Sequence, residues 1–357
     1  MSAGRSRGWP AFPGDAGEMR LTIAILARNY LLLAIIVAFT YFAWASPFFA
    51  TPFNLANLVR ESAELGIVCI GATLVLLIGR LDLSVGAVLA ISALIVIVGF
   101  KVIGLPWPFL VAVAVLFGLA AGAFNGVLTA VVGIPSFIAT LGTLIILRGV
   151  LQWATATAVL REANSIFTDN PSFRFVGNGL VLGAPVSLWL LGLLFVIVLL
   201  ALRVTRLGTA IYAIGGNIQA ATRAGLPIRR LEIGVFALAG VCSALAGVLL
   251  ASRLDSVSFQ TGQYLEFKVL VAVILGGTSV AGGQGGVWGT LLGVAFVGIL
   301  NNGMVMLTID RDIQDVVVGL FLVMALIVDR WLNQSTPAEW RRLLGSLRPR
   351  PTDGGGP

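Results

Sequence analysis

The chain has 357 residues, of which 58% are hydrophobic and only 11% charged, whereas soluble domains carry about 25% charged residues. This composition excludes an ordinary water-soluble enzyme, and most of the apolar surface is expected to face lipid. The chain has no histidine, the commonest general base and metal ligand. The net charge of +7 gathers in short basic clusters beside apolar runs, which is typical of a polytopic all-α membrane protein.

About ten apolar stretches are long enough to cross a bilayer as helices. Two uncharged tracts, 102–147 and 269–309, are too long for one crossing and are predicted to break at 133–135 and 282–286, where glycine and proline gather. The 43 glycines predict close helix packing. The predicted spans are 30–49, 64–79, 84–103, 108–132, 135–159, 186–202, 231–251, 267–280, 287–307 and 314–331.

Charge distribution predicts the orientation of these spans. With both termini in the cytoplasm, the segments on that side carry most of the arginines, as the positive-inside rule requires. The chain then divides into a cytoplasmic segment 1–29, a transmembrane domain 30–331 and a disordered cytoplasmic tail 332–357. Residues 160–185 are predicted to form an ordered external loop or cap. Cys69 and Cys242 each lie in an apolar run and are expected to be buried and unpaired.

The internal connection 203–230 carries the clearest local signal. A short alanine-rich stretch, 218–224, lies between Gly215-Gly216-Asn217 and Gly225-Leu226-Pro227. These are helix start and stop signals. They predict a short helix that lies along the membrane surface and docks onto another protein; the alternative is an ordinary loop between two spans.

Two further connections contain polar or glycine-rich motifs. Residues 275–286 hold too many glycines for a regular helix, so they predict a sheltered turn between two spans. The motif lacks the lysine of a phosphate-binding loop, and no such loop is found elsewhere. In the motif 79–86, Asp82 is expected to cap the next helix beside Ser84, with a proton-coupling site as the alternative.

Four blocks in the same order resemble the permease subunit of ribose-type monosaccharide ABC importers. They are GRLDLSVGAVLA at 79–90, GIPSFIATLG at 133–142, AIGGN…AGLP at 213–227 and LGGTSVAGGQGGVWGTLLG at 275–293. The resemblance implies an inner-membrane permease dimer, homomeric or heteromeric, with two cytoplasmic ATPase subunits and an extracytoplasmic sugar-binding protein. It also implies that ATP binds to the separate subunits and that this chain holds no cofactor or metal.

The resemblance also assigns residues. The helix that couples to the ATPase would comprise Gly216, Asn217, Gln219, Ala220, Ala221, Arg223, Ala224 and Gly225. Structural signature positions would be Asp82, Ser84, Gly86, Pro135, Gly276, Gly277 and Gly282. The chain departs from the family at Arg80, where glycine is usual, and in the coupling segment, which commonly carries acidic residues. These departures concern the docking contacts rather than their location.

A path for a hydroxyl-rich solute needs uncharged hydrogen-bonding groups and a few aromatic side chains. The candidates are Asn125, Gln152, Trp153, Asn301 and Asn302. Residues 123–127 and 300–304 also resemble each other, which predicts two pseudo-symmetric halves. Each asparagine has an alternative role as a hydrogen bond between helices.

Other functions remain open at this stage. One is an ABC permease for branched-chain amino acids or nucleosides. Another is a proton-coupled secondary transporter, which needs a carboxylate within the membrane. The carboxylates available for that role are Asp82, Glu266, Asp310 and Asp315. A membrane enzyme lacks a recognisable acid, base or metal constellation in this sequence.

Overall fold

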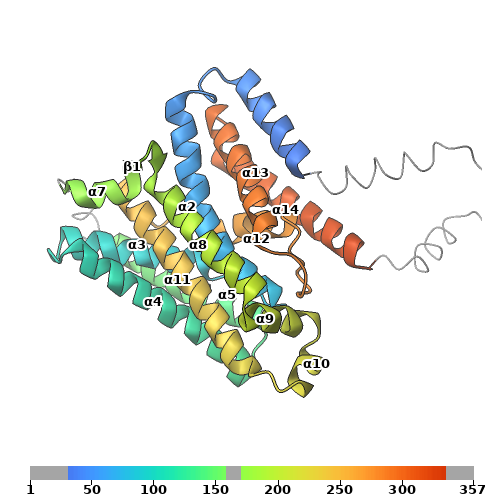
Figure 1. The fold of residues 1–357 in the computed structure, drawn as a ribbon. Coiled ribbons are helices and arrows are strands. Elements are labelled where there is room, and N and C mark those ends of the chain that lie inside the picture. The colour runs from blue at the N-terminus through green and yellow to red at the C-terminus, as the bar shows by residue number, and fades with distance from the viewer. Residues whose placement is uncertain (1–30, 158–169, 335–357) are drawn as a thin grey trace, which may run out of the picture.

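The computed structural model describes residues 31–157 and 170–334, and these form an all-α membrane protein with one small hairpin (Figure 1). The predicted segment 1–29 and tail residues 335–357 lie outside the described residues. The elements are the helix Leu31–Ala45, α2 (Pro52–Leu77), α3 (Val85–Lys101), α4 (Trp107–Val127), the π-helix η1 (Leu128–Val132), α5 (Ser136–Ala156), α7 (Pro171–Asn178), β1 (Leu180–Val181), β2 (Ala184–Pro185), α8 (Val186–Val204), α9 (Arg206–Gly216), α10 (Ile218–Arg223), α11 (Ile228–Leu254), α12 (Leu265–Leu275), α13 (Val287–Met306) and α14 (Arg311–Gln334).

Every predicted span falls on one of these helices. Among the described residues, α4 with η1, α5, α8, α11 and α13 are long and apolar enough to cross a membrane, and Leu31–Ala45 and α3 are shorter apolar helices. The predicted breaks are confirmed, because Gly133 and Pro135 separate η1 from α5 and residues 276–286 separate α12 from α13. The likeness of the two halves stays a prediction.

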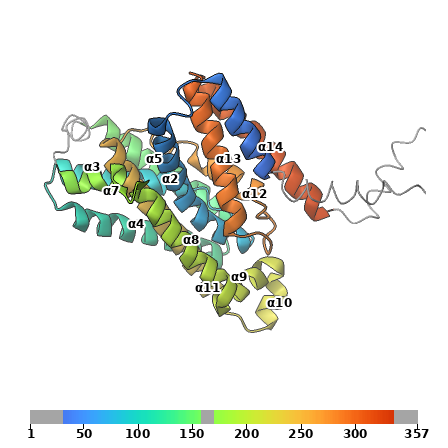
Figure 2. The ribbon, with the colours of Figure 1, turned by 45° about the horizontal axis from the view of Figure 1, so that its top comes forward.

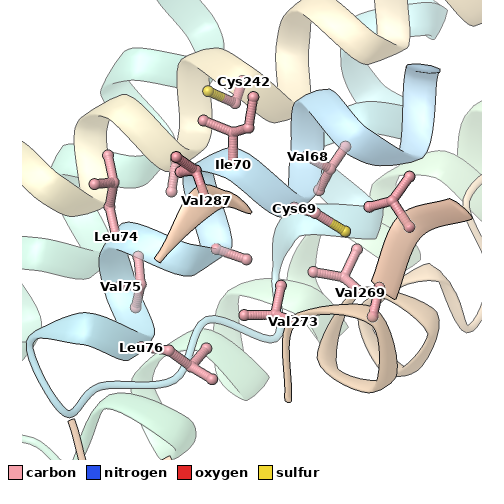
Figure 3. Close-up of a cluster of buried hydrophobic side chains, with 14 of the residues drawn as sticks. Val68, Cys69, Ile70, Leu74, Val75, Leu76, Cys242, Val269, Val273 and Val287 are labelled. Carbon is pink, nitrogen blue, oxygen red and sulfur yellow. The ribbon is translucent and has the colours of Figure 1, made fainter. Parts of the chain in front are cut away.

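The centre of the bundle is formed by α2 and α11. Between Gly66 and Leu77 every residue of α2 is buried, and the helix contacts α8, α11, α12 and α13. Figure 3 shows the apolar side chains of α2 facing those of α11, α12 and α13. Both cysteines are free and buried in this cluster, as predicted: Cys69 lies on α2 and Cys242 on α11. A continuous apolar helix fits this position because it is surrounded by protein on all sides.

Glycines bring α4 and α11 into backbone contact. Gly118, Gly122 and Gly126 recur every four residues along α4 and lie against the α11 backbone at Gly240, Phe236 and Ile233. An added Cβ at Gly126 would lie 2.6 Å from the Cα of Ile233. Small residues at this spacing let membrane helices approach closely, so the predicted tight packing is confirmed here.

The outer helices present apolar side chains to the surroundings. Large apolar residues are exposed on α4, α5 and α8, including Leu116, Ile145 and Leu193. A soluble protein rarely exposes such continuous apolar surface, so these faces are the lipid-contacting surface of a multi-pass protein.

The two ends of the bundle carry different structures. The short helices α9 and α10 lie at one end, whereas α7 and the β1–β2 hairpin lie at the other, as both views show (Figures 1 and 2). In the hairpin, Leu180 pairs with Pro185 and Val181 with Ala184. Within the predicted loop 160–185, residues 171–185 therefore form α7 and the hairpin, and residues 158–169 lie outside the described part of the chain.

Candidate functional site

The helix α10 forms where the start and stop signals predict it. Asn217 precedes the helix, and its Oδ1 accepts the backbone N–H of Ala220 at 2.9 Å. Gly225 follows the helix with a φ of +76°, a left-handed conformation that commonly ends helices. The segment is therefore a capped helix rather than an ordinary loop.

Most of the predicted docking residues are free on the surface. Only Ala221 is buried, with 3% of its surface exposed, and it packs into the main apolar cluster. The exposed members of the predicted set are Gly216, Asn217, Gln219, Ala220, Arg223, Ala224 and Gly225. One anchored side chain therefore holds α10 while the rest of the helix remains available for a partner, and the docking role itself stays a prediction.

Three non-helical points of the chain meet beside α9 and α10. They are the end of α2, the loop between α12 and α13, and the junction of α9 with α10. The glycine-rich loop between α12 and α13 donates the Gly283 N–H to the carbonyl of Leu77, the last residue of α2, at 2.9 Å. The Tyr212 hydroxyl of α9 donates to the Gly285 carbonyl at 2.9 Å. An added Cβ on Gly282 would lie 2.6 Å from the Gly79 nitrogen. These contacts connect α9 directly to this loop and, through the loop, to the end of α2.

The non-helical link between α2 and α3 is satisfied by side chains of α5. Ser136 Oγ accepts the Leu81 N–H and Thr140 Oγ1 accepts the Leu83 N–H, both at 3.1 Å. Non-helical backbone within a membrane protein is stable only where the surrounding protein provides such partners. Pro135, a predicted signature residue, directly precedes α5 and starts the helix that supplies them.

Asp82 lies two residues before the N-cap position that was expected for it. Its Oδ1 accepts the backbone N–H of Ser84 at 2.8 Å and the Ser84 hydroxyl at 2.7 Å. Ser84, not Asp82, is the N-cap of α3, and its side chain makes no capping bond. The predicted cap is corrected on this point: Asp82 closes a turn that fixes Ser84, because two residues separate the carboxylate from the first turn of the helix.

The signature glycines occupy different environments. Gly86 of α3 lies against the loop before α12, and an added Cβ would lie 2.8 Å from the Glu266 carboxylate. Gly276 lies against the backbone of Gly289 on α13. Gly277 has φ of +86°, and an added Cβ there would meet no described heavy atom within 4 Å. Close approach thus explains Gly86, Gly276 and Gly282 but not Gly277.

The five predicted pathway residues are not brought together. Asn125 is buried, donates to Ser84 Oγ at 2.9 Å and accepts from Thr143 Oγ1 at 2.6 Å. Asn302 exchanges two hydrogen bonds with Asn54 of α2, at 2.8 and 3.1 Å. Both asparagines therefore join helices, the alternative role considered for them. Their place on a solute path stays a prediction.

The other three candidates lie elsewhere. Gln152 and Trp153 are exposed near the end of α5, and Trp153 borders an apolar hollow between α3 and α4. Asn301 of α13 instead lines a cavity and accepts a hydrogen bond from the Lys268 ammonium at 3.0 Å. Among the five, only Asn301 lies in a polar hollow of the described chain.

This polar cavity has a volume of about 370 Å³. It lies near the end of α11 distant from α10, because Arg253 on the last turn of α11 lines it. A non-helical segment between α11 and α12 supplies part of its wall. The polar side chains around it are Glu61, Glu64, Arg253, Gln263, Lys268, Asn301 and Arg311.

Three of the five charged side chains around the polar cavity pair with one another, and the other two donate to side-chain amides. Arg253 binds Glu64 through two nitrogens, Nε at 2.8 Å and one terminal nitrogen at 2.9 Å, and approaches Glu61 at 3.4 Å. Arg311 donates to Gln260 at 3.0 Å. Pairing lowers the cost of keeping charges inside the bundle, and leaves a wall of fixed donors and acceptors suited to a neutral polar solute.

The sequence does not single out this cavity. Glu64 opens a predicted span, and a charged residue within an apolar run is a signal for a functional site. Its partner Arg253 is 189 residues away, however, and only the packing of α2 against α11 brings them together. Lys268 and Asn301 are likewise joined by the contact of α12 with α13.

The four carboxylates considered for proton coupling are scattered. Asp82 is enclosed with Ser84 beside α5, whereas Asp310 and Asp315 lie at the start of α14. Glu266 lies in the first turn of α12, and one of its oxygens has no hydrogen-bond partner among the described residues. These groups do not form a connected relay in the described part of the chain.

Comparison with known proteins agrees with this architecture. Residues 54–326 match the family described as branched-chain amino acid transport system / permease component. The chain is 36% identical to the ribose import permease protein RbsC of Haemophilus influenzae over 86% of this chain and 93% of that protein. It is 38% identical to RbsC of Bacillus subtilis over 80% of this chain and 87% of that protein. It is 30% identical to the xylose transport system permease protein XylH of Escherichia coli over 91% of this chain and 96% of that protein. No solved structure matches the chain. The match over most of its length, together with the helical architecture, establishes that this chain is a member of the branched-chain amino acid transport system permease family.

Proposed function

We propose that this chain is the membrane subunit of an ATP-driven importer and forms the path for a monosaccharide of the ribose or xylose type. Its relatives are permeases named for ribose, allose and xylose. The observation that carries the proposal is α10, a capped helix exposed at one end of the bundle and connected through α9 to the broken ends of α2 and α12. A partner that changes conformation and is docked on such a helix can move α9 and the helix ends bonded to it.

In this proposal each subunit of the importer has a separate task. ATP binds to separate ATPase subunits, which dock on α10, and a sugar-binding protein delivers solute to the opposite end. A second permease copy completes the assembly. The polar cavity near that opposite end offers paired charges and the Asn301 amide, groups that hydrogen-bond hydroxyls without holding a neutral solute tightly.

The orientation of the chain is part of this proposal. Five arginines lie from the last turn of α8 to the first turn of α11 and favour a cytoplasmic location for α10. They are Arg203, Arg206, Arg223, Arg229 and Arg230. Both native cysteines are buried, so a single introduced cysteine reports sidedness.

Labelling in intact cells tests the orientation. Gln219→Cys on α10 is expected to react only after the cells are opened, whereas Leu182→Cys, at a hairpin residue that is 89% exposed, reacts from outside. The reverse pattern refutes the orientation.

Docking on α10 is tested with a bulky substitution. Ala220→Trp is expected to abolish copurification of the ATPase and ATP-driven ribose uptake in proteoliposomes, because a large side chain on the exposed helix prevents close contact. The matched control is Ala112→Trp, at another exposed alanine, on α4. Equal loss in both variants, or ribose uptake by the chain without an ATPase, contradicts the proposal.

The solute class is tested by competition. Unlabelled ribose and xylose are expected to reduce uptake of labelled ribose, and leucine is not. Lys268→Met removes from the cavity wall an ammonium that is proposed to donate to a solute hydroxyl, and it is expected to lower uptake about tenfold, the effect of losing one charged hydrogen bond. Copurification with the ATPase is the control, since Lys268 lies far from α10. Uptake that competes with leucine alone assigns an amino acid instead.

A further inference from the structure

A second polar cavity lies beside α10 and plays no part in the proposed sugar path. Its volume is about 600 Å³, and it lies between α10, η1 and the first turn of α11. Three arginines and one glutamate supply its charged groups. The polar residues that line it are Arg80, Thr129, Thr222, Arg229, Arg230 and Glu232, and we refer to it as the arginine cavity.

The arginine cavity has an excess of positive charge. Arg80 donates twice to the same Glu232 oxygen, at 3.1 and 2.8 Å, and this glutamate is buried. Arg229 and Arg230 are exposed and have no ion-pair partner among the described residues. Both lie in the first turn of the long helix α11, whose positive end adds to the field. The cavity thus suits an anion with more than one hydrogen-bond acceptor.

Apolar, lipid-facing surface lies next to this charge. Val131 and Val132 at the end of η1 are exposed, as are Phe137 and Ile138 in the first turn of α5. The cavity is bounded by η1 on one side and by the exposed helix α10 on the other. It therefore lies where the lipid-contacting surface gives way to the cytoplasmic surface, which is the level of the lipid head groups.

We propose that the arginine cavity binds the phosphodiester head group of an anionic phospholipid of the cytoplasmic leaflet. The apolar surface below accommodates the acyl chains, and guanidinium groups bind phosphate oxygens in pairs. Basic pockets between membrane helices on this side are suited to such head groups. Ile218 and Thr222 of α10 form part of the wall, so a bound lipid would fix the position of the docking helix. The inference rests on the proposed orientation, in which α10 is cytoplasmic.

The test uses the purified full-length chain in detergent, without ATPase or solute, so its outcome is separate from that of the uptake experiments. Native mass spectrometry measures binding of added phosphatidylglycerol and of phosphatidylcholine. The wild type is expected to retain phosphatidylglycerol preferentially. The double variant Arg229→Gln/Arg230→Gln is expected to lose about tenfold or more of this binding, because two charge-assisted contacts are removed.

The matched control is Arg203→Gln/Arg206→Gln. It removes the same charge from exposed arginines on the same side of the bundle, outside the arginine cavity. It is expected to retain the lipid, and melting curves of both variants establish that they are folded. Equal loss in the two double variants indicates diffuse attraction and overturns the site.

Two further results overturn the lipid assignment. One is displacement of the lipid by inorganic phosphate at millimolar concentration, which indicates a site for a free anion. The other is an unchanged lipid signal in Arg229→Gln/Arg230→Gln, which shows that these arginines do not hold the lipid; a separate loss of ATPase copurification in this variant would assign them to the protein partner.

Discussion

Gly282 provides the most direct test of how the interrupted helices fit together. It lies in the loop between α12 and α13 with φ of +88°. An added Cβ would lie 2.6 Å from the nitrogen and 2.7 Å from the Cα of Gly79, and 3.0 Å from the Cα of Gly215. These neighbours are backbone atoms of two other segments, so no side-chain rotation can relieve the contact.

The expected cost of Gly282→Ala has two parts. A residue with a Cβ in the left-handed region costs about 1–2 kcal/mol. Forcing extra volume into a filled space costs about 1–3 kcal/mol more, because the surrounding backbone has to move. The total is about 2–5 kcal/mol of unfolding free energy. Gly277→Ala is the matched control: its φ is +86°, but the added Cβ meets no described atom within 4 Å, so only the first part applies.

Unfolding of both variants in mixed detergent micelles measures the difference. Gly282→Ala is expected to be less stable than Gly277→Ala by about 1–3 kcal/mol, and its ATP-driven uptake is expected to fall further than its stability alone explains. If the two alanine variants are equally stable, close approach to Gly79 is not the reason for glycine at position 282.

Three further changes have expected outcomes. Arg253→Met leaves Glu64 buried without its partner and is expected to destabilise the protein by about 3–5 kcal/mol in the same micelle assay. Adding Glu64→Met is expected to restore most of this stability. A double variant that is no more stable than Arg253→Met contradicts the pairing. Asn54→Ala is expected to cost about 0.6–1.7 kcal/mol by removing two bonds to Asn302 and one to the Phe49 carbonyl, and an unchanged midpoint in the micelle assay means that these bonds contribute nothing. Ser136→Ala leaves the Leu81 N–H without its acceptor and is expected to cost about 1–3 kcal/mol, with faster amide exchange at Leu81; exchange at the wild-type rate refutes the role of Ser136.

Local signals predict much of the fold. Apolar length places the spans on helices, and glycine and proline mark the breaks at Gly133–Pro135 and after Leu275. The caps around α10 are predicted because Asn217 and Gly225 act on their own neighbours in sequence. Each of these features depends on interactions within a few residues, which a single sequence contains.

Features that depend on distant residues are not predicted. The first half of α2, with Arg60 and Glu61, is too charged to resemble a span, and its helical continuation depends on packing against α8, α11 and α13. The polar cavity depends on pairs such as Lys268 with Asn301 from different helices. The position of Asp82, two residues before the N-cap, depends on Ser136 and Thr140, which accept the backbone N–H groups of the link.

The pairing of Glu64 with Arg253 also affects how the protein is made. The ribosome completes α2 and its carboxylates well before it makes Arg253, which follows Glu64 by 189 residues. Until then α2 carries unneutralised charge, and it is not among the described helices apolar enough to span a membrane unaided. A charged residue opposes entry from the translocon by about 3 kcal/mol. We therefore expect the innermost helix of the bundle to reach its final depth late in biogenesis, after α11 has been made.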